Sequence, residues 1–179
     1  RLVIDCNRPL RSAESIVEES AGVPVPRNCG LSPAERESRI NALFRPYHDA
    51  IDELLNGRSR RPSLLLSVHS FTPVLNGVSR SVEMGVLWDA DEEVARIVIE
   101  ELRNAGYKVG DNEPYSGKAP QDFTVDHHAE GNALRHAAIE IRQDLIDDDQ
   151  GVDEVAAVLA DVDHRPGPLL VRDRTGRNP

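Results

Sequence analysis

Short apolar runs alternate with segments of helical periodicity along this chain, and this alternation limits the fold more than any other feature of the sequence. Runs typical of buried strands cover residues 1–5, 64–68, 82–88, 107–110 and 136–141. Helical periodicity covers residues 33–57, 91–105 and 153–162. Because strands that alternate with helices build layered domains, we predict an α/β three-layer sandwich with a central mixed, mostly parallel sheet flanked by helices.

Local signals set the bounds of the first helix and of the domain. Ser32 and Glu35 form a capping box at its start, and Gly57 supplies its end. Pro46 is expected to kink it. Residues 111–131 lack periodicity and predict a long loop, a feature that is often functional in compact domains. We assign residues 1–165 to a single domain and 166–179 to a C-terminal tail.

The charge balance restricts the partners of this chain. The 179 residues carry a net charge of -10, which opposes binding to nucleic acid or to an anionic membrane surface. An anionic ligand therefore needs a local cluster of arginines. The two cysteines do not resemble a disulfide framework, and no apolar run approaches the roughly 20 residues that span a bilayer. We expect a cytoplasmic protein; the sequence predicts no oligomeric state.

Asn7 and Arg8 directly follow the first apolar run, where the carboxyl end of a strand would place them at the ligand-binding edge of an α/β sheet. The guanidinium of Arg8 has the shape to bind a carboxylate with two hydrogen bonds. The alternative is an ordinary surface ion pair between Arg8 and a nearby carboxylate.

His69 follows a second apolar run and is well placed to bind a metal ion through one ring nitrogen. The alternative is a histidine with a purely structural role.

Glu140 and Arg142 lie on one face of the last predicted strand. A buried carboxylate needs a partner, so Glu140 is either a general base beside a cation or half of a structural ion pair with Arg142.

Other polar residues carry weaker signals. Tyr115, in the predicted loop, could donate a hydrogen bond to a ligand or simply order the loop. His127 and His128 do not have the spacing of a zinc motif, and adjacent side chains are expected to point to different sides, although one of them could bind substrate. His48 and His136 are interpreted as structural.

Taken in order, these segments resemble the N-formylglutamate amidohydrolase family. The resemblance covers most of the chain, with matching segments at residues 1–9, 69–73, 85–91, 112–116, 128–129 and 139–146. It implies a zinc-dependent hydrolase that cleaves the amide bond of N-formylglutamate, or of a related N-acyl amino acid, and releases formate or another carboxylic acid. It also implies a place in histidine degradation.

The same anchors are distantly similar to the zinc carboxypeptidases, which implies a phosphorylase/hydrolase-like sheet. By this resemblance, Asn7 and Arg8 seat the carboxylate of the substrate, His69 binds one zinc ion, and Glu140 activates the water. Arg80, Tyr115 and Arg142 are further candidates for substrate contacts. Iron, cobalt or manganese can occupy similar ligand sets.

One departure affects the metal. Family members carry two further metal ligands upstream of the segment that opens this chain, so we expect the natural protein to begin earlier. Two alternatives remain at this point: a carboxypeptidase-like deacylase with another substrate, and a non-catalytic relative that binds carboxylates without a metal.

Overall fold

The computed structural model describes residues 2–20, 22–57, 64–118, 122–132 and 134–164. The chain divides into two compact units, of which the first is Arg1–Arg61 with Pro120–His128 and the second is Pro62–Ala119 with Ala129–Pro179. The predicted tail, 166–179, lies outside the described residues. The assignment of 1–165 to one domain stays a prediction. In the described part of the chain, no helix combines the length and apolar character needed to cross a bilayer.

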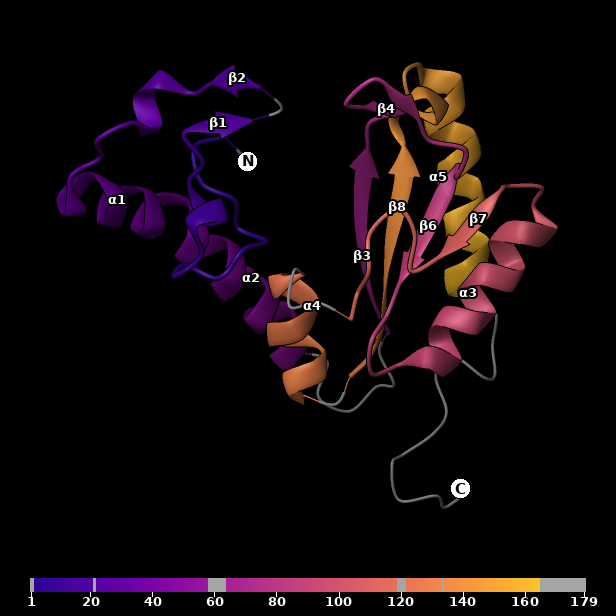
Figure 1. Ribbon diagram of the computed structural model, residues 1–179. Helices are drawn as coiled ribbons and strands as arrows, with labels where there is room; N and C mark the ends of the chain where they lie inside the picture. The colour runs from indigo at the N-terminus through magenta and orange to yellow at the C-terminus, as the bar shows by residue number, and fades with distance from the viewer. Residues whose placement is uncertain (1, 21, 58–63, 119–121, 133, 165–179) are drawn as a thin grey trace. The chain divides into compact units, whose positions relative to one another are not determined.

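The second unit is built on a four-stranded sheet in the order β3-β8-β6-β7 (Figure 1). Its strands are β3 (Leu64–Phe71), β6 (Met84–Leu87), β7 (Val109–Asp111) and β8 (Arg135–Arg142). β3 pairs with β8 and β6 with β7 in parallel, whereas β6 and β8 are antiparallel. This mixed, mostly parallel sheet flanked by helices confirms the predicted α/β class.

Two helices, α3 (Glu92–Asn104) and α5 (Asp149–His164), bury one face of this sheet. Asp91 caps α3 by accepting a hydrogen bond from the amide of Val94, which leaves the apolar stripe of the helix facing inward. Fully buried residues of both helices pack on alternate residues of the central strands, including Met84, Val86 and Ile139. The opposite face of β8 therefore carries His136, Ala138, Glu140 and Arg142.

Short elements complete the second unit. The hairpin β4 (Val74–Leu75) and β5 (Val78–Ser79) follows β3, and the 3-10 helices η4 (Glu130–Asn132) and η5 (Gln143–Leu145) flank β8.

The first unit is largely helical. Residues predicted as one kinked helix form three consecutive segments, α1 (Pro33–Arg39), a π-helical stretch η3 (Ile40–Phe44) and α2 (Arg45–Asn56). The predicted capping box of α1 is confirmed. Pro46 lies in the first turn of α2 and has no backbone N–H to donate. The π-helical stretch η3 ends directly before this turn.

Smaller elements fill the rest of the first unit. They are the 3-10 helices η1 (Ala13–Ser15) and η2 (Pro26–Asn28), the strands β1 (Glu19–Ser20) and β2 (Val23–Pro24), and the helix α4 (Phe123–His128).

The predicted strand at residues 1–5 is wrong for the described residues 2–5, which adopt no strand. Their backbone is held by side chains instead: Asn28 donates to the carbonyl of Leu2 at 2.8 Å, and Arg39 donates to the carbonyl of Val3 at 2.8 Å. Apolar composition alone could not distinguish this segment from a strand.

The prediction of an uninterrupted loop over residues 111–131 is also wrong. Helix α4 and the 3-10 helix η4 interrupt it. The six residues of α4 are too few to show a clear helical period, and a helix this short is unstable without contacts from other parts of the chain.

Candidate active site

His69 and Glu140 are register partners on the neighbouring parallel strands β3 and β8. Residues paired in this way lie on the same face of a sheet, with strands about 4.8 Å apart. Glu140 is 9% exposed, and His69 is half-buried with its Nε2 atom 2.8 Å from the hydroxyl of Ser67. The second unit therefore places a histidine and a buried carboxylate next to each other on the sheet face that α3 and α5 leave uncovered.

On its other side Glu140 pairs with Gly85 of β6, and a loop folds over that position. A side chain at Gly85 would collide with the carbonyl oxygen of Glu113, so glycine is required for this close approach. Asn112 shapes the loop by accepting hydrogen bonds from the amides of Trp88 and Gly117. Residues 112–117 thus cover β6 beside Glu140, which gives the predicted polar loop a defined position.

Arg80 and Tyr115, two predicted substrate contacts, lie together. The guanidinium of Arg80 donates a hydrogen bond to the Tyr115 hydroxyl at 2.9 Å and lies 5.4 Å from the centre of the Phe71 ring. Phe71 is two residues beyond His69 on β3, so it faces the same side of the sheet. This end of the sheet therefore presents a cation held between two aromatic rings.

Arg142 is committed to structural contacts. It forms an ion pair with Asp144 at 2.7 Å and donates hydrogen bonds to the carbonyls of Arg80 and Val82. The hydrogen bonds from Arg142 hold the pKa of the Asp144 carboxyl below its usual value. An anionic ligand would have to compete with Asp144 for this guanidinium.

Asn7 and Arg8 belong to the first unit and also have structural partners. The side-chain oxygen of Asn7 accepts a hydrogen bond from the amide of Thr124 at 2.8 Å, in the first turn of α4. Arg8 forms an ion pair with the exposed Glu14 at 3.0 Å, which matches the ordinary surface pair considered as the alternative. A substrate carboxylate would replace Glu14 on Arg8.

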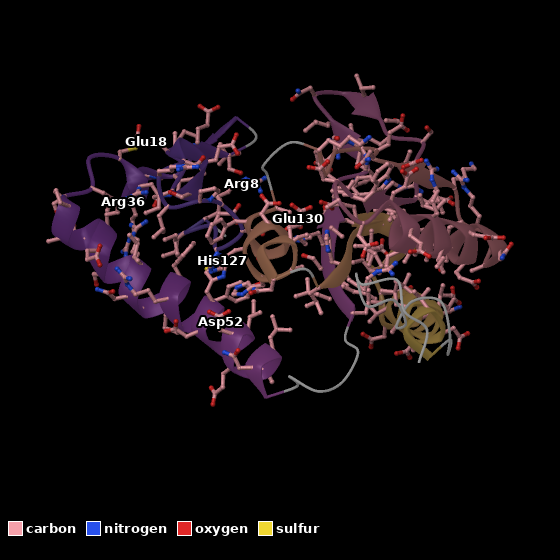
Figure 2. All side chains as sticks on the ribbon, turned by 90° about the horizontal axis from the view of Figure 1, so that it is seen from below. Arg8, Glu18, Arg36, Asp52, His127 and Glu130 are labelled. Carbon is pink, nitrogen blue, oxygen red and sulfur yellow. The ribbon has the colours of Figure 1, made fainter. Side chains whose placement is uncertain are left out.

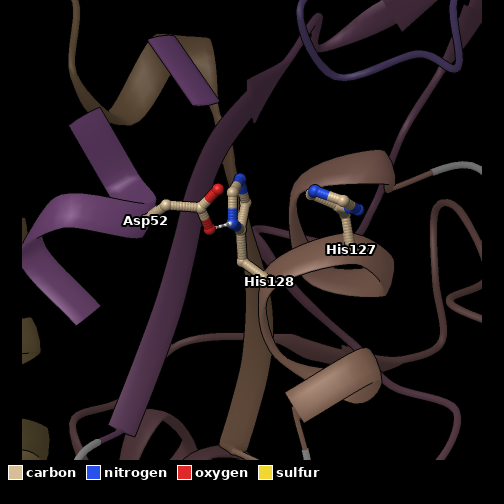
Figure 3. A group of neighbouring side chains, drawn as sticks. All are labelled: Asp52, His127 and His128. Carbon is tan, nitrogen blue, oxygen red and sulfur yellow. Dashed lines mark hydrogen bonds and ion pairs between the residues drawn. The ribbon is translucent and has the colours of Figure 1, made fainter. Parts of the chain in front are cut away.

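A second polar cluster lies within the first unit and was not predicted. Asp52 of α2 and His127 of α4 lie near each other (Figure 2), and His128 lies between them (Figure 3). One metal-ligating atom from each of the three lies within 4.8 Å of the others. His127 is exposed and His128 is fully buried, yet one ring nitrogen of each reaches the same small group of atoms as the Asp52 carboxylate.

Hydrogen bonds extend this cluster inward. Nδ1 of the fully buried His128 lies 2.9 Å from Oδ1 of Asp52, and its Nε2 lies 2.8 Å from Nδ1 of His48. Nε2 of His48 donates to the carbonyl oxygen of Cys6 at 2.9 Å. Burial lowers the pKa of His48, which favours the neutral ring. His48 and Asp52 are four residues apart on α2, and this spacing was the sequence signal for their shared face.

The fold and this pair of strand residues define an α/β protein with a candidate hydrolytic face. The sequence profile of the family described as "FGase: N-formylglutamate amidohydrolase" matches residues 1–147. The chain belongs to the N-formylglutamate amidohydrolase family. None of the curated proteins matches it.

Two solved structures are similar to the chain. One is the gene product Atu2144 from Agrobacterium tumefaciens, with a TM-score of 0.80 and 34% identity over 91% of this chain and 65% of that one. The other is N-formylglutamate amidohydrolase from Ralstonia eutropha JMP134, with a TM-score of 0.60 and 23% identity over 83% of this chain and 57% of that one. The chain thus spans less than two thirds of the length of either protein.

Proposed function

We propose that the protein hydrolyses the amide bond of N-formylglutamate or of a related N-acyl amino acid. The observation that carries this proposal is the pairing of His69 with the buried Glu140 on adjacent strands, in a chain of the N-formylglutamate amidohydrolase family. A carboxylate in this position is suited to take a proton from an attacking water and to return it to the departing amine.

Zinc is part of the proposal, with His69 as one ligand. Bound zinc lowers the pKa of its water to about 7 and polarises an acyl oxygen. A catalytic zinc usually has three protein ligands, however, and among the described residues a set of three meets at Asp52, His127 and His128 and not around His69. His69 therefore fits the metal only in part.

The other residues have proposed roles in binding. Asn7 and Arg8 seat the carboxylate that an N-acyl amino acid carries and a simple amide lacks. Arg80 and Tyr115 supply a second anchor, for which the aromatic contacts of Arg80 are the support. Arg142 is a weaker candidate for substrate binding because its guanidinium already forms an ion pair with Asp144.

The experiment is formate release from N-formylglutamate by the full-length natural protein, with simple N-alkyl formamides as the comparison. We expect Glu140→Gln to lower kcat by at least about 100-fold, the scale of general-base catalysis. Arg8→Ala should mainly raise KM, since it removes binding and not chemistry. The reverse pattern would contradict these roles.

A second candidate function is binding of N-acyl amino acids without turnover. The observation that favours it is the sparse ligand set around His69 within the described residues. Saturable binding of N-formylglutamate with no formate release, unchanged by added zinc, would select this candidate.

A further inference from the structure

The cluster of Asp52, His127 and His128 has no role in the proposed hydrolysis. Both ring nitrogens of His128 lie within hydrogen-bonding distance of a neighbour, one of His48 and the other of Asp52. The carbonyl oxygen of Cys6 can only accept, so Nε2 of His48 carries the hydrogen in their 2.9 Å contact. The other ring nitrogen of His48, Nδ1, lies 2.8 Å from Nε2 of His128. Nε2 of His128 is therefore engaged with His48, which leaves Nδ1 as the ring nitrogen that faces Asp52.

Nδ1 of His128 can carry a proton or offer a lone pair, and it lies 2.9 Å from a carboxylate oxygen of Asp52. Two acceptor atoms at this distance repel each other unless a cation lies between them. The cation is either a proton or a metal ion. His128 is fully buried, whereas the side chain of Asp52 is half exposed, so solvent reaches the pair from one side.

His127 provides a third possible metal ligand, and its position favours a metal ion over a proton between Asp52 and His128. A proton shared by Asp52 and His128 needs no further ligand, but a metal ion does. His127 is exposed and its ring stacks on Phe123 with centroids 5.2 Å apart, close to the other two groups. Tetrahedral zinc ligands lie about 3.4 Å apart, so side-chain shifts on the order of 1.5 Å would close separations of up to 4.8 Å and complete the set.

We propose that Asp52, His127 and His128 form a binding site for one divalent transition-metal ion such as Zn²⁺. Two imidazoles and a carboxylate are ligands that such ions favour, with a fourth position open to water. His48 then acts as the outer partner that orients His128, because a histidine that binds metal typically donates its other N–H to a neighbouring group. The negative net charge of the chain favours cation binding.

The metal ion would link α2 to α4 within the first unit. Helix α4 has six residues, and its first turn already holds Asn7 through the hydrogen bond from Thr124 to the Asn7 side chain. His127 and His128 form the last turn of the same helix. A metal ion at this end would stabilise α4, and with it the backbone around Asn7. This inference is independent of the proposed hydrolysis.

The test uses the full chain without an affinity tag, stripped of metal with a chelator and titrated with Zn²⁺ by calorimetry. We expect one equivalent to bind tightly, because among the described residues three ligands meet at this site and not around His69. The thermal midpoint should rise by several degrees, on the order of 3–6 °C. Asp52→Asn and His127→Ala should each weaken Zn²⁺ binding at least about 10-fold. Both positions are at least partly exposed, so both variants should fold.

Glu53→Gln is the matched control, because it removes the same charge from the adjacent exposed position of α2. His69→Ala separates this site from the proposed catalytic histidine. Co²⁺ in place of Zn²⁺ gives an absorption spectrum that His127→Ala should alter and His69→Ala should leave unchanged. Absence of binding would show that the pair holds only a proton. Binding that is lost in His69→Ala or Glu53→Gln but retained in Asp52→Asn would likewise overturn the proposal.

Discussion

The two units of this protein differ in the interactions that stabilise each of them internally. The second unit buries a continuous apolar core between its sheet and two helices, with Met84, Val94 and Leu102 fully inaccessible. The first unit has a small core of four buried apolar residues among those described, and relies on side chains that bond to backbone carbonyls. Apolar packing therefore stabilises the second unit, whereas hydrogen bonds from side chains to backbone carbonyls contribute more to the stability of the first.

The largest expected effect is on the apolar core of the second unit. Leu102→Ala removes a fully buried side chain from α3 and leaves a cavity, so it should lower the free energy of unfolding by about 3 kcal/mol. Urea denaturation gives the value. Leu54→Ala, at an exposed position of the first unit, is the control and should change the stability by less than about 0.5 kcal/mol. Equal losses in the two variants would refute the comparison.

The corresponding change in the first unit targets a polar residue. The side chain of the buried Asn28 donates to the carbonyls of Leu2 and Val17 and accepts from Arg39. Asn28→Ala removes these three hydrogen bonds and should cost about 2 kcal/mol. Hydrogen exchange should show the loss confined to the first unit, while the exposed Ser38→Ala has no comparable effect. A neutral Asn28→Ala would mean that polar contacts do not stabilise this unit.

A smaller effect is expected where the loop crosses β6. Gly85→Ala places a methyl group against the carbonyl of Glu113 and should destabilise the protein by about 1–2 kcal/mol. Because the loop carries Tyr115, the contact with Arg80 should weaken as well. Formate release at limiting substrate reports this second effect. Unchanged stability together with unchanged activity would show that the loop does not cover β6 in solution.

The smallest effect concerns pH. The folded pKa of Asp144 is below its usual value, so the contribution of its pair with Arg142 is complete above about pH 3.8 and is lost as the pH falls through the lower folded value. Wild type should therefore lose more stability than Asp144→Asn over that acid range. Asp144 is exposed to solvent, which screens the pair, so the difference should be small. Parallel acid profiles for the two proteins would contradict it.

The contrast between the units also explains what the sequence could predict. Strands β3, β6 and β8 and helix α3 follow apolar patterns, and His69 and Glu140 could be placed because both lie on such strands. Residues 1–5 carry an apolar run as well, but side chains of Asn28 and Arg39 distant in sequence take up its carbonyls. Hydrogen bonds between residues so far apart in sequence cannot be predicted from the spacing of apolar residues.

The Asp52, His127 and His128 cluster was missed for a related reason. Asp52 on α2 lies more than 70 positions from the two adjacent histidines on α4, and α4 falls within a stretch that had no helical pattern. The same holds for Asn7, whose amide oxygen caps α4. Short helices that depend on polar partners leave little trace in a single sequence.

The most direct test of the central claim is formate release from N-formylglutamate by the full-length natural protein and by its Glu140→Gln variant, with folding of both verified by circular dichroism. The account predicts turnover by the natural protein and a loss of at least about 100-fold in kcat for the variant, with substrate binding retained. Equal turnover by the two proteins would show that Glu140 is not the base. Binding without turnover by the natural protein would contradict the hydrolase itself.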